Sequence, residues 1–106
     1  MNTPIFTLSA TNLSNEDEIF DALAVVDYES EDAAIGAARE LAGKLASSYD
    51  DVCQVTVYGG EWRTPGGDVH GETYDIFTIS NKSKEKTMDA RKKAGYVQLE
   101  VNEYIG

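Results

Sequence analysis

The feature that most constrains the fold is a pair of strand-like segments on either side of a glycine-rich turn. Apolar residues alternate with polar ones at Cys53, Val55 and Val57, and residues 74–80 form a second segment of this kind. Between them, the stretch Thr64-Pro65-Gly66-Gly67 fits a type II turn, because proline suits the second position and glycine the third. The sequence therefore predicts a long antiparallel hairpin.

The register of this hairpin depends on whether one strand carries an extra residue. A strict count outward from the turn pairs Val55 with Ile76, whereas a single bulge pairs Val55 with Phe77. Gly59-Gly60 and Gly71 are the positions that suit such a bulge, because glycine accepts the backbone angles that bulges need. Both registers remain open at this point.

The clearest single element is a helix over residues 31–48. Ser30 is a good N-cap, two acidic residues follow it in the first turn, and apolar residues recur at helical spacing. A second helix over residues 84–94 begins after Ser83 and ends before Gly95. Strands are expected at residues 4–10, 20–28 and 97–102, although a helix starting at Ser14 and running through Leu23 competes with the strand at 20–28.

These elements predict an α+β fold in one domain spanning residues 1–106. Without the first strand, their order along the chain is βαββαβ, which is the ferredoxin-like order. We therefore expect an antiparallel sheet with two helices on one face and an extra N-terminal strand.

The charge of the chain excludes several functions. Its 19 acidic and 9 basic residues give a formal net charge of −10. This charge opposes direct binding to nucleic acid through its phosphates, and opposes binding to an anionic membrane, but it permits a basic protein partner. A single cysteine rules out an internal disulfide, and no apolar run has the length of a membrane span. With no signal-peptide pattern at the N-terminus, we expect a cytoplasmic protein.

The residues suited to catalysis are few. Cys53 and His70 are the candidate nucleophile and base, but Cys53 lies on the apolar side of its strand, which is typical of a buried small residue. Asp68, His70 and Glu72 alternate and would share one side of a strand, yet one histidine without a sulfur ligand is weak evidence for a metal. No phosphate-binding glycine motif occurs. We therefore predict a protein that is not an enzyme and has no catalytic, cofactor or metal site.

The acidic residues are concentrated in one segment. Residues 1–81 contain 15 acids and 3 bases, whereas residues 82–106 contain 4 acids and 6 bases. The eight acids between residues 16 and 32 are interrupted by no base, and they are Glu16, Asp17, Glu18, Asp21, Asp27, Glu29, Glu31 and Asp32. Such a cluster either keeps the protein dissolved or binds a basic surface on a partner. Trp62, near the turn of the hairpin, is a further candidate for partner binding.

The sheet suggests an alternative function. If both helices cover one face, the other face carries apolar and aromatic residues, namely Leu23, Val25, Tyr58, Tyr74 and Ile76. An exposed face of this kind predicts a homodimer or an assembly protein, unless the register is displaced by one residue and these side chains belong to the core.

The small size, the acidic segment 16–32, the Ser-Glu-Asp-Ala-Ala helix start at Ser30–Ala34 and the long hairpin together resemble small phage-encoded inhibitors of the anti-CRISPR or antirestriction kind. The resemblance is a general one over the whole chain and rests on no specific motif, so it assigns no functional residues. It implies a protein that blocks a nucleic-acid-handling partner stoichiometrically through its acidic surface, in the host cytoplasm.

Overall fold

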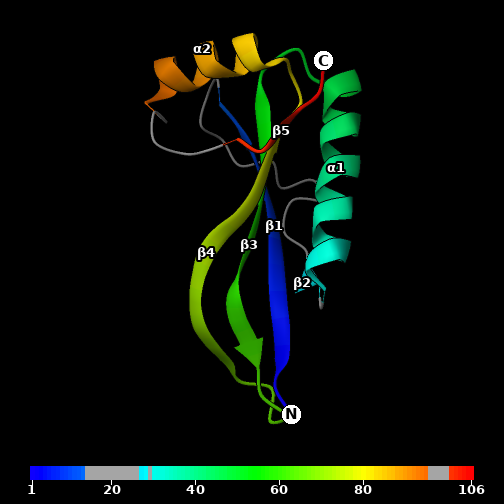
Figure 1. The fold of residues 1–106 in the computed structure, drawn as a ribbon, viewed down its shortest axis with the longest axis vertical. Helices are drawn as coiled ribbons and strands as arrows, with labels where there is room; N and C mark the ends of the chain where they lie inside the picture. Colours follow the sequence, from blue (N-terminus) through cyan, green and yellow to red (C-terminus); the bar gives the residue numbers. More distant parts are fainter. Residues whose placement is uncertain (14–26, 29, 96–100) are drawn as a thin grey trace.

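The computed structural model describes residues 1–13, 27–28, 30–95 and 101–106. They form an elongated α+β fold that measures 44 × 26 × 21 Å (Figure 1). Its elements are β1 (Thr3–Asn12), β2 (Asp27–Tyr28), α1 (Glu31–Ser48), β3 (Cys53–Arg63), β4 (Val69–Ser80), α2 (Lys84–Ala94) and β5 (Glu103–Tyr104). Most of the strand expected at residues 20–28, and most of the strand expected at 97–102, lie outside the described residues. Residues 101–102 are described but belong to no strand, so β5 begins beyond the expected range.

The arrangement of the sheet corrects two expectations. The strand order is β2-β1-β3-β4-β5, so the N-terminal strand lies inside the sheet rather than being added to a ferredoxin-like core. The sheet is mixed, since β5 pairs parallel to β4 while the other pairs are antiparallel. The physical reason is the connection through α2, because a helical crossover returns the chain to the starting end of the strand and makes the next pairing parallel.

Helix α1 forms as its sequence predicts. Its bounds are the expected ones, and the side chain of Ser30 accepts a hydrogen bond from the backbone N–H of Ala33. Its buried residues are Ala34, Ala38, Leu41, Ala42 and Leu45. They pack with alternate residues of β1, β3 and β4 into one apolar core between the helix and the sheet, which includes Leu8, Ala10, Val55, Val57, Phe77 and Ile79.

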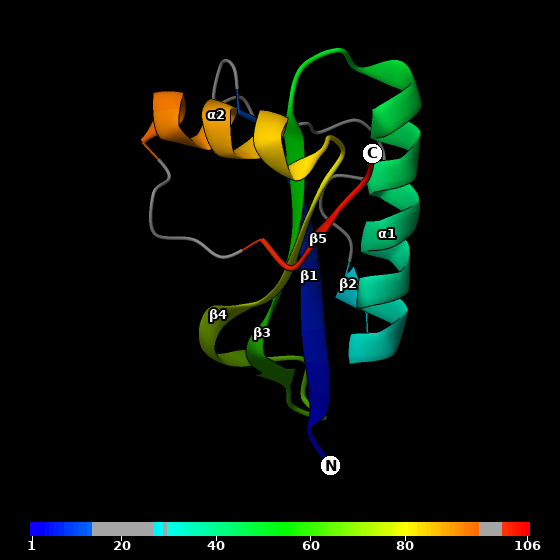
Figure 2. The same ribbon diagram turned by 45° about the horizontal axis from the view of Figure 1, so that its top comes forward.

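Helix α2 also has the expected bounds, with Ser83 as N-cap and Gly95 in the left-handed conformation at its end. It does not share the face of α1. Side chains alternate along β4, so Ser80 points away from the face that Phe77 and Ile79 present to α1. The hydroxyl of Ser80 lies 2.6 Å from that of Thr87 in α2, and Figure 2 shows the two helices on different sides of the strands. The expectation of two helices on one face is therefore wrong.

The hairpin has neither of the two expected registers. Val55 lies opposite Ile79 and Val57 opposite Phe77, because the loop at the turn has one residue more than a two-residue turn and the ladder then shifts twice along β4. Gly60 and Gly71, two of the glycines expected to suit a bulge, lie beside one of these shifts with φ values of 101° and 102°. The hairpin also forms without a type II turn.

The turn itself is a three-residue loop. The N–H of Gly67 donates to the carbonyl of Thr64, and the N–H of Thr64 donates to the carbonyl of Asp68. Gly67, with φ of 92°, is the left-handed residue, whereas a type II turn needs that conformation at Gly66. These bonds define a turn followed by a left-handed glycine, which adds one residue to the loop.

This turn makes a prediction for two adjacent glycines. Gly67→Ala should lower the free energy of unfolding by about 1 kcal/mol, because a Cβ is strained at positive φ. Gly66→Ala is the matched control and should have little effect, since its φ is not positive and the nearest atom to an added Cβ is 3.8 Å away. Urea denaturation of both variants measures the difference, and equal effects would contradict the assigned turn.

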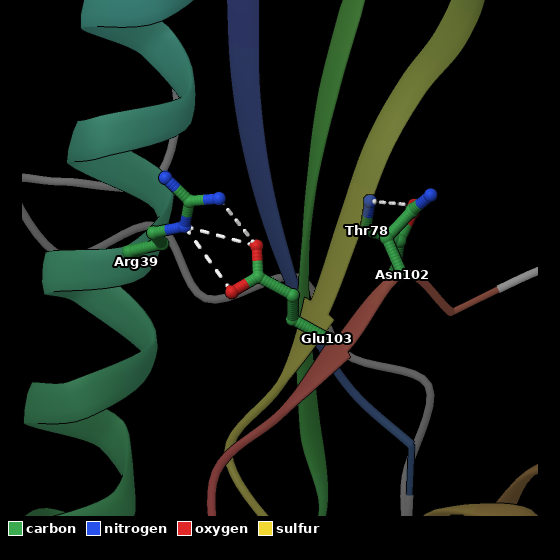
Figure 3. Close-up of polar contacts among 4 residues, drawn as sticks. All are labelled: Arg39, Thr78, Asn102 and Glu103. Atoms are coloured by element: carbon green, nitrogen blue, oxygen red, sulfur yellow. Dashed lines mark hydrogen bonds and ion pairs between the residues drawn. The ribbon is translucent and has the colours of Figure 1, made fainter.

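The C-terminal segment is fixed against β4 and α1 (Figure 3). The backbone of Asn102 donates to the carbonyl of Thr78, and its side-chain oxygen accepts from the N–H of Thr78, at 2.8 Å in each case. One residue further, the carboxylate of Glu103 accepts hydrogen bonds from Nε and Nη2 of Arg39 in α1. This carboxylate raises the pKa of Arg39. The segment thus occupies the edge of β4 beside residues 78–80.

No helix among the described residues combines the length and the apolar character that crossing a membrane requires.

Candidate functional site

The most exposed part of the described structure is the outer half of the hairpin. We define the hairpin arm as residues 59–75, which comprise the end of β3, the turn and the start of β4. In Figure 1 the arm projects past the N-terminal end of α1, beside the start of β1. Every residue from Val69 to Asp75 is exposed, whereas Phe77 to Ser80 at the other end of β4 are buried.

Aromatic side chains lie against glycines of the arm. Trp62 is 39% exposed, and its ring lies 6.2 Å from that of His70, measured between centroids. A Cβ placed on Gly71 would come within 2.7 Å of the Trp62 ring, and one on Gly60 within 2.8 Å of the Tyr74 ring. The two glycines therefore let the rings lie close to the backbone, which restricts the rings while Tyr74 remains 61% exposed.

The arm is acidic. Its carboxylates are Glu61, Asp68, Glu72 and Asp75, and Arg63 is its one lysine or arginine. Most bases of the described chain lie elsewhere, above all on α2 at the other end of the molecule (Figures 1 and 2). The arm thus combines exposed aromatic rings with negative charge, which is a composition suited to a basic protein surface.

The predicted acidic segment is described only in part. Glu31 and Asp32 are exposed in the first turn of α1, and Asp27 belongs to β2. The other predicted acids, Glu16, Asp17, Glu18, Asp21 and Glu29, lie outside the described residues. Trp62 is on the surface, where a residue that binds a partner must be.

The sequence did not predict that the four acids of the arm and Tyr74 lie on the same exposed part of the hairpin. They are spaced over fifteen residues, so no run of charge marks them. The available signal was the length of the hairpin, because two strands longer than the neighbouring helix can cover must leave their outer ends exposed.

The open apolar face expected of the sheet is not assembled as predicted. Ile76 packs against the hydrophobic core, and Tyr74 is exposed on the arm. Leu23 and Val25 lie outside the described residues. On the side of the sheet away from α1, the described face is instead polar, with Gln54, Thr56, Thr78 and Ser80 all buried.

Cys53 and His70 are not brought together. Cys53 begins β3, whereas His70 lies opposite Trp62, nine residues further along that strand. At the rise of an extended strand this separates them by about 30 Å, far beyond hydrogen-bond distance. Burial, and then the charge of Asp51, raise the pKa of the Cys53 thiol to about 11. The thiol therefore stays protonated near neutral pH and is a poor nucleophile.

This environment makes a prediction for thiol chemistry. Cys53 has no exposed surface, so native protein at pH 8 should react with iodoacetamide at least about tenfold more slowly than urea-unfolded protein. The raised pKa also means that thiolate forms in the unfolded chain first as the pH rises from 9 towards 11. Stability should therefore fall in that interval, and by less in Cys53→Ala. Rapid native alkylation at pH 8 would contradict the buried position.

Other sites for small ligands are not evident in the described part of the chain. Asp68, His70 and Glu72 do not form a metal-binding group, and the described residues contain no cluster of three or more potential ligands. A pocket between α1 and β1, lined in part by Leu8, Tyr28 and Lys44, has a volume of only about 60 Å³. Ligand pockets are roughly five times larger or more.

No protein-family model, curated protein or solved structure matches the chain.

Proposed function

We propose that this protein is a non-enzymatic inhibitor that binds a basic, nucleic-acid-handling protein, in the manner of anti-CRISPR or antirestriction proteins. The observation that carries the proposal is the hairpin arm, which carries four carboxylates on the same exposed strands as the rings of Trp62 and Tyr74. Glu31 and Asp32, exposed at the start of α1, extend the negative charge, and the predicted acids between residues 16 and 29 belong to the same proposal.

The proposed mechanism is stoichiometric blocking. Lysine and arginine side chains that bind phosphates form a positive surface, and carboxylates held on a rigid scaffold are attracted to it. The aromatic rings add apolar contact area that screening by salt does not weaken. Once bound, the arm excludes nucleic acid because both ligands need the same cationic side chains.

The test is inhibition of purified CRISPR effector nucleases and restriction enzymes by increasing amounts of the protein. We expect DNA cleavage by a susceptible enzyme to stop near a one-to-one ratio, and inhibition to weaken as salt is raised. The double variant Asp68→Lys with Glu72→Lys should raise the concentration needed by about tenfold or more, because it places positive charge against a basic surface.

The matched control reverses the same amount of charge elsewhere. Glu85→Lys with Asp89→Lys changes two exposed acids of α2, far from the arm, and should leave inhibition unchanged. A further variant reverses the predicted acids Glu16, Asp17, Glu18, Glu29 and Glu31, and should also weaken inhibition. Absence of inhibition across the panel, or equal losses in the arm and α2 variants, would refute the proposal.

A further inference from the structure

We propose that the partner contributes an extended basic segment, which adds to the sheet as a new strand along the free outer edge of β4 at Val69–Asp75. The inference rests on the proposed function and specifies how the basic partner is held. Strand addition supplies affinity through main-chain hydrogen bonds, and side chains on either side of the new strand supply specificity.

The first argument is that this edge is unoccupied in the described structure. β4 pairs with β3 on its inner side, and on its outer side the described C-terminal segment reaches only residues 78–80. Both ribbon views show no described element beside the outer half of β4 (Figures 1 and 2). Its residues 69–75 are all exposed.

The second argument is the direction of the backbone groups. The hydrogen bond from the N–H of Thr64 to the carbonyl of Asp68 makes these two residues a hydrogen-bonded pair. Such pairs alternate with pairs whose N–H and C=O groups point away from the partner strand. Arg63 and Val69 form the next pair, so the N–H and C=O of Val69 point to the outer edge, where an added strand can bond to them.

The third argument is that the same edge already binds a strand at its other end. Beside residues 78–80, the C-terminal segment pairs in parallel with β4 through the backbones of Asn102 and Ile105. The edge of β4 therefore has a geometry that accepts a neighbouring strand. The chain uses it over the buried end of β4 and leaves the exposed end open.

The fourth argument identifies the occupant by charge. An added strand would lie beside a surface with four carboxylates and one arginine, so lysine or arginine side chains on the incoming segment are favoured. A second copy of this chain would bring the same acidic strand to the edge, and like charges facing each other across two strands are destabilising. A basic partner segment therefore fits the edge better than self-association does.

The test uses a synthetic peptide of about eight residues that alternates lysine and valine, with its ends blocked. We expect it to bind the whole protein, measured by calorimetry, and to slow amide exchange at Val69. Two matched peptides separate charge from strand pairing: one has glutamate in place of lysine, and the other keeps lysine but carries N-methyl groups on one edge of its backbone. Both should bind at least about tenfold more weakly.

A protein variant tests the same edge from the other side. Val69→Pro removes an outward N–H without removing a bond to β3, and should weaken binding of the lysine peptide about tenfold. Val69→Thr keeps the N–H and should bind as the parent does. Circular dichroism of both variants checks that the fold is retained. If Val69→Pro does not fold, the amide exchange of Val69 in the parent protein with bound peptide decides the question instead.

The outcomes are distinct from those of the inhibition assay. Equal binding of the N-methylated and unmodified lysine peptides, or no binding of either, would overturn strand addition. Inhibition that persists with those results would leave the proposed function intact and locate the contact in side chains alone. If the lysine peptide binds but the parent protein inhibits no enzyme of the panel, the proposed target class would be refuted.

Discussion

Replacing Asn81 by alanine is expected to lower the free energy of unfolding by about 3 kcal/mol or more. Asn81 is 2% exposed, and its side chain joins three parts of the chain. Its Oδ1 accepts from the N–H of Cys53 at 2.8 Å, while its Nδ2 donates to the carbonyls of Leu45 and Asp51. Alanine would leave the buried N–H of Cys53 without a partner and would remove one bond from each of the two carbonyls, and an unsatisfied buried group alone costs about 1–3 kcal/mol.

The control is the same substitution at Asn102, which is exposed and whose side chain bonds to the N–H of Thr78. Water can replace much of that bond, so Asn102→Ala should cost about 1 kcal/mol or less. Urea denaturation followed by circular dichroism measures both variants. Similar losses would show that Asn81 does not hold the ends of α1, β3 and β4 together.

Substituting alanine for Gly60 is the second change with a large expected effect. A Cβ at this position would lie 2.2 Å from the carbonyl oxygen of Glu72, which is a backbone atom and cannot move alone. Positive φ adds a further cost, so we expect a loss of about 2–3 kcal/mol, seen as a lower unfolding temperature. Faster amide exchange across residues 59–75 should accompany it, because the clash lies in the hairpin arm.

Gly36→Ala is the control for that experiment. An added Cβ there has no atom within 4 Å, and Gly36 is in the interior of α1, where alanine is the better helix former. This substitution should therefore stabilise the protein by about 0.5–1 kcal/mol. If Gly60→Ala were as harmless, the close approach of β3 and β4 at the bulge would be wrong.

The bounds of both helices were predictable because their signals are local. Ser30 and Ser83 bond to backbone N–H groups three residues ahead, and Gly95 ends α2 with a left-handed backbone. Each of these interactions joins residues within one turn of helix, so the identity of a few neighbours decides it.

The turn and the register were predictable only in outline. A hairpin with glycine-associated bulges was expected, but the left-handed residue is Gly67 rather than Gly66, and β4 shifts twice rather than once or not at all. Register depends on which side chains reach the core, and Val55 opposite Ile79 is selected by packing against α1. Local composition cannot distinguish registers that differ by one residue.

The candidate site too was predictable only in part. The burial of Cys53 agrees with the sequence prediction, while partner binding by Trp62, which is on the surface, stays a prediction. The separation of Cys53 from His70, and the gathering of acids on the arm, follow from the length of β3 and its pairing with β4. These are distances between segments, which no short motif records.

The sequence by itself determined the α+β class, both helices with their bounds, the long hairpin between them and the strong excess of negative charge. Hydrogen-bond caps, alternation and composition act over a few residues and can be read directly. The tertiary structure alone decided that β1 lies within the sheet, that β5 runs parallel to β4, and that α1 and α2 lie on different sides. The reason is that strand order and helix placement minimise exposed apolar surface and unpaired backbone over the whole chain at once. The hairpin arm is exposed because β3 and β4 extend beyond the N-terminal end of α1.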